Sequence, residues 1–181
     1  MADVRRLYTI RHDYTALRTS GTRELSRIRL IVLHSAEALS AEAVGRWFAD
    51  PRAQGSAHFG VDQDSIQRYL PLRAVPWGAP GVNSDGVHIE QCGYARWTRD
   101  GWLRRDEMLD RVAWLMAVLA RRLDIPLRSL SDEELRRGER GVTTHRQCTL
   151  VYGGTHTDPG AGYPLDWVLA RARHYRRLMG G

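Results

Sequence analysis

The segment Leu30-Ile31-Val32-Leu33-His34 is a short apolar run, rich in β-branched residues, that follows Arg29 and ends at a histidine. A run of this length and composition, bounded by polar residues, is typical of a buried strand. We therefore expect a strand over residues 30–33, with His34 at its carboxyl end.

Three helices are predicted around this strand. Residues 40–48 have the pattern of an amphipathic helix capped by Ser40. Residues 106–123 carry apolar side chains at helical spacing over a wide face, which predicts a deeply packed helix. Residues 166–178 predict a basic terminal helix with Asp166 as its cap.

Further strands are expected between these helices. Residues 58–62 and 66–70 have the pattern of a β-hairpin, and residues 87–91 and 142–145 are shorter candidates. Strands interleaved with helices predict an α/β fold, in which a mixed central sheet is flanked by helices.

The composition limits the class of protein. The chain has 181 residues, enough for one domain with a sizeable core. No apolar run approaches the roughly 20 residues that span a bilayer, so membrane insertion is not expected. The net charge of +6 comes from arginine on the basic side, because the sequence contains no lysine. These arginines are scattered among acidic residues without a nucleic-acid-binding motif, so we expect no binding to nucleic acid.

The first residues and the cysteines both indicate a reducing compartment of synthesis. The start of the chain lacks the apolar stretch and cleavage site of a secretory signal, which predicts synthesis in the cytoplasm. Cys92 and Cys148 are too few and too widely separated for a disulfide framework, so both are expected to be free thiols.

Three polar residues lie where the backbone is expected to become irregular: His34, His145 and Asp158. Catalytic zinc takes three nitrogen, oxygen or sulfur ligands and keeps a fourth position for water, whose pKa it lowers to about 7. These residues fit that requirement. Glu90 supplies a proton acceptor on the neighbouring strand, and alternation places His88 on the same face of the sheet. Spacing alone also allows a structural interpretation, with hydrogen-bonded histidines at strand ends and Asp158 in a turn.

Several segments, in order, resemble the zinc amidase family that includes phage lysozyme-type amidases, muropeptide-recycling amidases and peptidoglycan recognition proteins. The resemblance covers most of residues 29–168. The matching segments are Ile31-Val32-Leu33-His34-Ser35-Ala36, Ser56-Ala57-His58-Phe59-Gly60-Val61-Asp62, Val75-Pro76-Trp77-Gly78-Ala79-Pro80-Gly81, Ile89-Glu90-Gln91-Cys92-Gly93-Tyr94-Ala95, Gly141-Val142-Thr143-Thr144-His145 and Thr157-Asp158-Pro159-Gly160-Ala161-Gly162-Tyr163-Pro164.

The resemblance implies that His34, His145 and Asp158 are the ligands of a Zn2+ cofactor. It implies hydrolysis of the amide bond between N-acetylmuramic acid and L-alanine in peptidoglycan. Glu90 matches the carboxylate that takes a proton from the attacking water, and His156 is the candidate donor to the oxyanion. An alternative makes His156 the third ligand and Asp158 its orienting partner.

The sequence departs from the resembling families at three positions. Ala57 stands where phage lysozyme-type members have a tyrosine, which leaves Glu90 as the only base. His156 stands where many relatives have lysine, and its imidazole is only partly charged at pH 7. Gly78 stands where many relatives have histidine, which suggests a changed substrate groove.

Three further residues are candidates for substrate binding. Trp77 can stack on sugar or peptide. His58 and His88 can line the groove, although a histidine on a sheet face is more often simply a hydrogen-bonded polar side chain.

The resemblance therefore predicts the peptidoglycan recognition protein and phage-lysozyme type of fold, with residues 1–28 as a lead-in packed on the domain and residues 29–181 as the zinc amidase domain. We expect a monomeric phage endolysin that is made in the host cytoplasm and acts on the cell wall after release. Two alternatives stay open: a non-catalytic peptidoglycan recognition module, and a zinc peptidase that cuts within the stem peptide.

Overall fold

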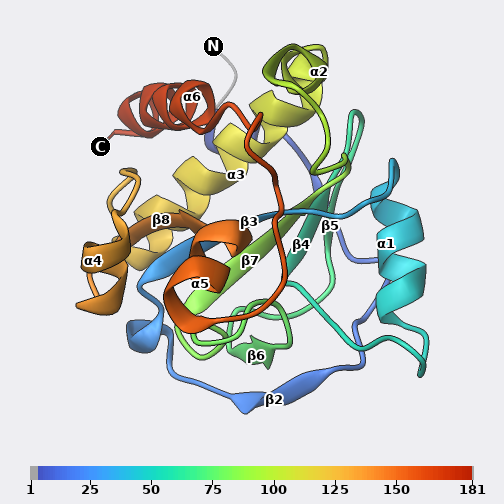
Figure 1. Ribbon diagram of the computed structural model, residues 1–181. Helices are drawn as coiled ribbons and strands as arrows, with labels where there is room; N and C mark the ends of the chain where they lie inside the picture. The colour runs from blue at the N-terminus through green and yellow to red at the C-terminus, as the bar shows by residue number, and fades with distance from the viewer. Residues whose placement is uncertain (1–3, 181) are drawn as a thin grey trace.

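The computed structural model describes residues 4–180 and has a central β-sheet surrounded by helices (Figure 1). Residues 1–3 of the predicted lead-in and residue 181 of the predicted catalytic domain lie outside the described residues. Six strands form the sheet in the order β1-β5-β4-β7-β3-β8. Their bounds are Ile10–Arg11 (β1), Leu30–Ser35 (β3), Phe59–Val61 (β4), Ile66–Arg68 (β5), Gly86–Gln91 (β7) and Gly141–Thr144 (β8).

The sheet is mixed, as the sequence predicts. β4 and β5 are antiparallel and form the predicted hairpin, whereas the other pairs in this sheet are parallel. β3 lies between β7 and β8, and the register pairs His34 with Glu90. β3 is buried along its whole length, which explains why its sequence is continuously apolar rather than alternating.

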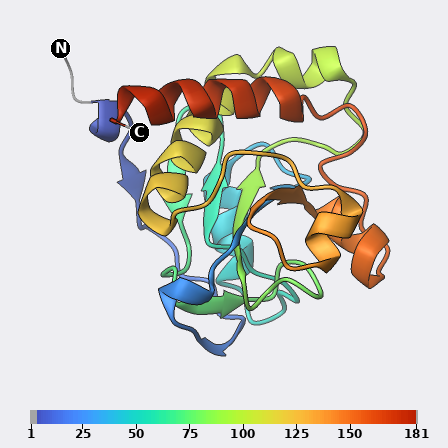
Figure 2. The ribbon, with the colours of Figure 1, turned by 90° about the vertical axis from the view of Figure 1, so that its left-hand side faces the viewer.

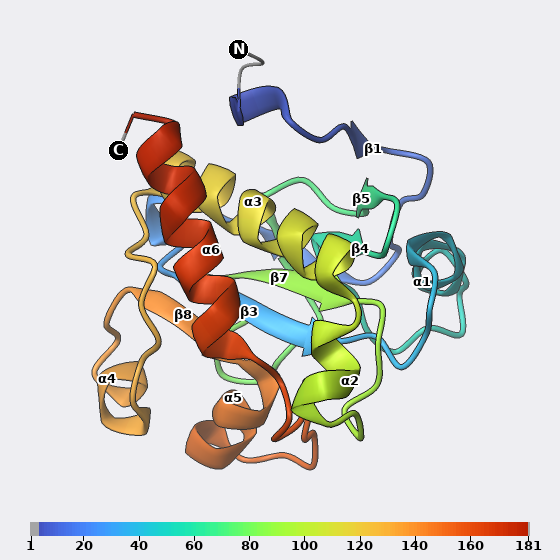
Figure 3. The same cartoon turned by 90° about the horizontal axis from the view of Figure 1, so that it is seen from above.

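The helices confirm the predicted α/β architecture. α3 and α6 pack against each other, and α3 lies on β4 and β7 (Figures 2 and 3). α1 begins after Ser40, whose side chain accepts a hydrogen bond from the backbone N–H of Ala43 as an N-cap. None of the helices in residues 4–180 is long and apolar enough to cross a bilayer. The bounds are Ala41–Phe48 (α1), Arg99–Leu103 (α2), Asp106–Leu123 (α3), Asp132–Arg136 (α4), His145–Tyr152 (α5) and Leu165–Leu178 (α6).

The two faces of β3 pack against different parts of the chain. Leu33 belongs to the larger core, which contains the buried residues of α3. Val32 belongs to a smaller core that includes Cys148 of α5. Because side chains alternate along a strand, His34 lies on the α5 face, and its register partner Glu90 lies on the same face.

A network of hydrogen bonds ties the N-terminal segment to α3 and α6. The hydroxyl groups of Tyr8 and Tyr175 donate to Asp110 of α3, at 2.6 and 2.5 Å. Arg171 of α6 forms an ion pair with the same carboxylate. Burial alone would raise the pKa of Asp110, but these hydrogen bonds outweigh it and hold the pKa below its usual value.

A second, two-stranded sheet pairs β2 (Thr19–Thr22) with β6 (Ala74–Pro76) in antiparallel orientation. The sequence pattern does not predict it, because all of β2 is exposed and carries no apolar alternation. The short helices α2 and α4 were likewise not expected, since each has only five residues.

The predicted positions of His145 and Asp166 at the ends of their elements are wrong. The strand predicted at 142–145 ends at Thr144, which caps α5, so that His145 is the first residue of a helix rather than the last of a strand. α6 begins at Leu165, so Asp166 lies inside its first turn and is not the cap. Asp166 instead pairs with Arg99 at 2.7 Å.

Candidate metal centre and groove

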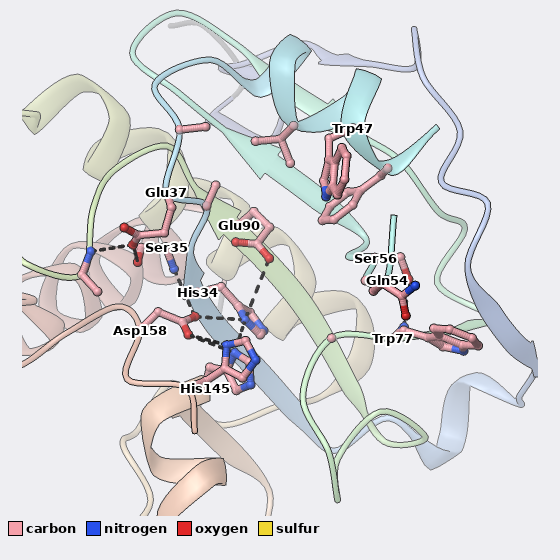
Figure 4. Close-up of a pocket in the computed structure, with 18 of the residues that line it drawn as sticks. His34, Ser35, Glu37, Trp47, Gln54, Ser56, Trp77, Glu90, His145 and Asp158 are labelled. Carbon is pink, nitrogen blue, oxygen red and sulfur yellow. Dashed lines mark hydrogen bonds and ion pairs between the residues drawn. The ribbon is translucent and has the colours of Figure 1, made fainter. Parts of the chain in front are cut away.

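Neighbouring strands and one loop bring three buried side chains together (Figure 4). His34 comes from the carboxyl end of β3, and His145 follows the adjacent strand β8 as the first residue of α5. Asp158 lies in the loop between α5 and α6. Its carbonyl oxygen accepts a hydrogen bond from the backbone N–H of Arg146 at 2.7 Å, and its carboxylate accepts one from the N–H of Ser35 at 3.4 Å.

The three side chains direct their polar atoms at a common centre. Nδ1 of His34 lies 3.1 Å from Nδ1 of His145 and 3.3 Å from Oδ2 of Asp158. Nδ1 of His145 lies 3.1 Å from Oδ1 of Asp158. Ligand atoms held 2.0–2.1 Å from one tetrahedral ion lie about 3.3 Å apart, so this donor set fits a zinc ion. One ligand atom from each of the three residues lies within 4.8 Å of the other two.

The charge balance of this cluster also suits a cation. Burial alone would raise the pKa of Asp158, but hydrogen bonding to His145 and His34 outweighs it and holds the pKa far below its usual value. Burial lowers the pKa of His34. A charged carboxylate beside a neutral imidazole is the combination that binds a divalent metal.

Glu90 lies beside the cluster. Its Oε1 is 3.9 Å from Nδ1 of His34, and its side chain is only 14% exposed. Among the described residues, no group forms a hydrogen bond with the buried Oε2. Burial raises the pKa of Glu90 to about 8, and repulsion from Asp158 and Glu37 adds to this effect. A carboxyl group whose pKa is shifted in this way toward neutral pH is suited to proton transfer.

His156 lies at the edge of the cluster, where its side chain is 61% exposed. Its ring stacks on that of His145, with the ring centroids 4.1 Å apart. Its Nδ1 lies 3.5 Å from Oδ1 of Asp158. The structure thus brings His156 to the site but leaves it outside the group of atoms that converge on one centre.

His58 and His88 do not lie where the sequence interpretation places them. Both are fully buried and neither lines the groove, so they do not meet the expectation that they contact substrate. The interpretation fails because strand alternation predicts the face on which a side chain lies but not how deeply it is covered.

A groove of about 920 Å³ runs from the cluster of His34, His145 and Asp158 to two tryptophans (Figure 4). Trp77 is 41% exposed and Trp47 is 49% exposed, and both line the groove. Large aromatic rings left exposed in a groove are typical of binding surfaces for sugars and peptides.

Some groove residues were missed from the sequence. Glu37 has a left-handed backbone with φ of 50°, and its Oε1 accepts hydrogen bonds from Oγ of Ser35 and the N–H of Ala95. Gln54 and Ser56 line the groove between the two tryptophans. The left-handed Glu37 could not be found from its sequence, because no glycine or asparagine marks the position.

A cluster that can hold a metal, next to a glutamate free to take a proton, is what a metal-assisted hydrolase requires. The sequence profile of the N-acetylmuramoyl-L-alanine amidases matches residues 24–161, and the chain belongs to this family. It is therefore an amidase of bacterial peptidoglycan, as the resemblance predicts. No curated protein matches the chain.

Several solved structures share the fold. The crystal structure of the Staphylococcus aureus hydrolase AmiA in complex with its ligand has a TM-score of 0.73 and 20% identity, and the match covers 95% of this chain and 85% of that chain. The N-acetylmuramoyl-L-alanine amidase LysC from Clostridium intestinale URNW has a TM-score of 0.60 and 16% identity, with coverage of 91% and 97%. A mutant endolysin from Bacillus subtilis has a TM-score of 0.59 and 21% identity, with coverage of 96% and 100%. These similarities confirm the predicted fold.

Proposed function

We propose that this amidase is a zinc enzyme of the endolysin type, in which His34, His145 and Asp158 hold the metal. The observation that supports this most directly is the convergence of two Nδ1 atoms and one carboxylate at mutual distances of 3.1–3.3 Å. Asp158 is preferred to His156 as the third ligand because it is buried and contacts both other ligands, whereas His156 is largely exposed.

Zinc bound there would polarise the lactyl carbonyl and lower the pKa of a coordinated water toward 7. Glu90 takes the proton from the attacking water and delivers it to the nitrogen of L-alanine as the amide bond breaks. Within residues 4–180 no group forms a hydrogen bond with Oε2 of Glu90, so this atom is available for proton transfer.

His156 donates a hydrogen bond to the oxygen of the scissile carbonyl as negative charge develops on it. Its ring is exposed to the groove and kept in place by stacking on His145, which suits a group that must meet substrate. The stem peptide and the adjoining sugar lie along the groove, with Trp77 and Trp47 as stacking surfaces.

The biological setting proposed is phage-induced lysis. A monomeric enzyme is made in the cytoplasm of the host and acts on the cell wall after a separate release step.

Digestion of purified sacculi tests this proposal. Mass spectrometry should find peptides with new L-alanine amino termini and glycan strands that have lost their peptides, and a strong chelator should abolish both products. Cuts within the stem peptide would support the peptidase, and binding without products would support the recognition module. Either result would overturn the proposed reaction.

A further inference from the structure

His88 lies directly behind one of the proposed ligands and is unused by the mechanism. It stands two residues before Glu90 on β7 and is fully buried. Its Nδ1 is 3.0 Å from Nε2 of His34. On the other side, the backbone N–H of His88 donates to Nδ1 of His58 at 3.1 Å, which anchors this part of the strand.

The direction of the hydrogen bond between His34 and His88 follows from the proposed site. Nδ1 of His34 points at His145 and Asp158, so in the metal-bound protein Nδ1 must offer its lone pair to the metal instead of a proton to Asp158. A neutral imidazole carries a single proton, which must then be on Nε2. Nε2 of His34 therefore donates to Nδ1 of His88, and the proton of His88 is on its own Nε2.

Two glycines leave the space that the His88 ring occupies. A Cβ atom at Gly78 would lie 2.3 Å from Nδ1 of His88, and one at Gly86 would lie 2.9 Å from its Nε2. Both contacts are closer than packed atoms allow. Gly78, in the connector after Trp77, thus leaves room for the buried ring of His88 behind the proposed metal site, and does not only widen the groove.

We propose that His88 is a positioning residue of the metal centre: it accepts the Nε2–H hydrogen bond of His34 and so presents Nδ1 of His34 to the metal. This inference rests on the proposed metal site. Metal-binding histidines usually donate their second N–H to a carboxylate, a carbonyl oxygen or water, and loss of that acceptor typically weakens metal binding 10- to 100-fold. Here a second, neutral histidine has that role.

The test compares His88→Asn with His88→Leu. Asparagine places Oδ1 on the same atom, Cγ, that carries Nδ1 in histidine, so it keeps an acceptor for His34. Leucine fills similar space without one. Val87→Ala is the matched control, because Val87 is the buried neighbour on the same strand and belongs to the larger core on the other face. Zn2+ affinity is measured by competition with a chromophoric chelator, and the absorption spectrum of the Co2+ form reports the ligand geometry.

The proposal expects His88→Leu to bind Zn2+ about 10- to 100-fold more weakly and to alter the Co2+ spectrum. His88→Asn should recover most of the affinity, and Val87→Ala should bind Zn2+ like the wild type even though it unfolds at a lower temperature. Wild-type affinity in His88→Leu would overturn the proposal, and so would equal losses in the leucine and asparagine variants.

Gly78→Ala provides a second route to the same answer if the leucine variant does not fold. Its added methyl group would displace the His88 ring, so weaker Zn2+ binding supports the proposal and unchanged binding overturns it. The outcomes also separate this inference from the proposed function. A wild-type protein that binds no Zn2+ overturns both, whereas Zn2+ binding that is lost in His34→Ala but unaffected in the His88 variants overturns the inference alone.

Discussion

Replacing Glu90 with glutamine should make the metal-free protein more stable. The same replacement should remove most of the activity of the zinc-loaded enzyme. The carboxyl group of Glu90 is buried without a hydrogen-bond partner on Oε2, and its pKa is raised from 4.5 to about 8. The unfolded chain therefore releases this proton above pH 4.5, whereas the folded protein keeps it until about pH 8. The contribution of Glu90 to stability is full below pH 4.5 and is lost as the pH rises toward 8.

The size of the effect follows from this interval. At pH 7 the unfolded chain is about 2.5 pH units above the pKa at which it releases the proton, while the folded protein still holds it. This difference corresponds to about 3 kcal/mol at about 1.36 kcal/mol per unit. Glutamine has nearly the same shape and does not titrate. The metal-free Glu90→Gln variant should thus exceed the wild type in free energy of unfolding by up to about 3 kcal/mol at pH 7, and by little at pH 4.5.

Urea unfolding of chelator-treated protein at several pH values measures this difference. Comparing the two proteins at each pH removes the titration of the other groups, because they are common to both. In parallel, the variant should bind Zn2+ with nearly wild-type affinity and lose about 10²- to 10⁴-fold in kcat on peptidoglycan, as expected for loss of a general base. A stability difference that does not grow between pH 4.5 and 7 would refute the argument from burial, and unchanged kcat would exclude Glu90 as the base.

Three other changes test separate parts of the site and the fold. His34→Ala should lower metal content and activity together, and a full complement of zinc by elemental analysis would exclude it as a ligand. Trp77→Ala should raise KM more than it lowers kcat, because it removes stacking area in the groove and leaves the reacting groups in place; an effect on kcat alone in steady-state assays would contradict that role. Asp110→Ala should destabilise the protein by about 2 kcal/mol, since it removes the partly buried hydrogen bonds that two tyrosine hydroxyls make to this carboxylate, while activity per folded molecule stays unchanged. Unaltered chemical unfolding of that variant would show that the network contributes little.

The elements that carry the site were predictable where the local pattern is strong. The apolar run before His34 identifies β3. The spacing of apolar residues predicts the β4–β5 hairpin and α3, and together with the N-cap Ser40 it predicts α1. Alternation then places Glu90 and His88 on one face of β7. What the pattern cannot supply is the order of the strands. The pairing of His34 with Glu90 depends on β3 and β7 being neighbours, although more than 50 residues separate them.

The depth at which a side chain is buried and the short strands and helices are the features that the sequence predicts least well. Nothing in the sequence of β7 indicates that His88 is covered while Glu90 reaches the groove, because His58, which packs beside the His88 ring, and Gly78, which leaves room for it, lie elsewhere in the chain. β2 was not predicted because its pairing with β6 is decided by long-range contacts and not by its own exposed residues.

The segment before residue 24 lies outside the family match, yet it helps to build the groove. Oγ of Ser20 accepts a hydrogen bond from Nε1 of Trp77 at 2.7 Å, and the guanidinium of Arg18 lies 5.7 Å from the centre of the same indole. Arg18 also donates to the carbonyl oxygens of Pro51 and Ala53 in the loop after α1. The ring that we propose for stacking on substrate is therefore oriented by Arg18 and Ser20, which lie outside the part of the chain that matches the family profile. Differences in this segment between related enzymes should accordingly change substrate affinity without any change in the metal ligands.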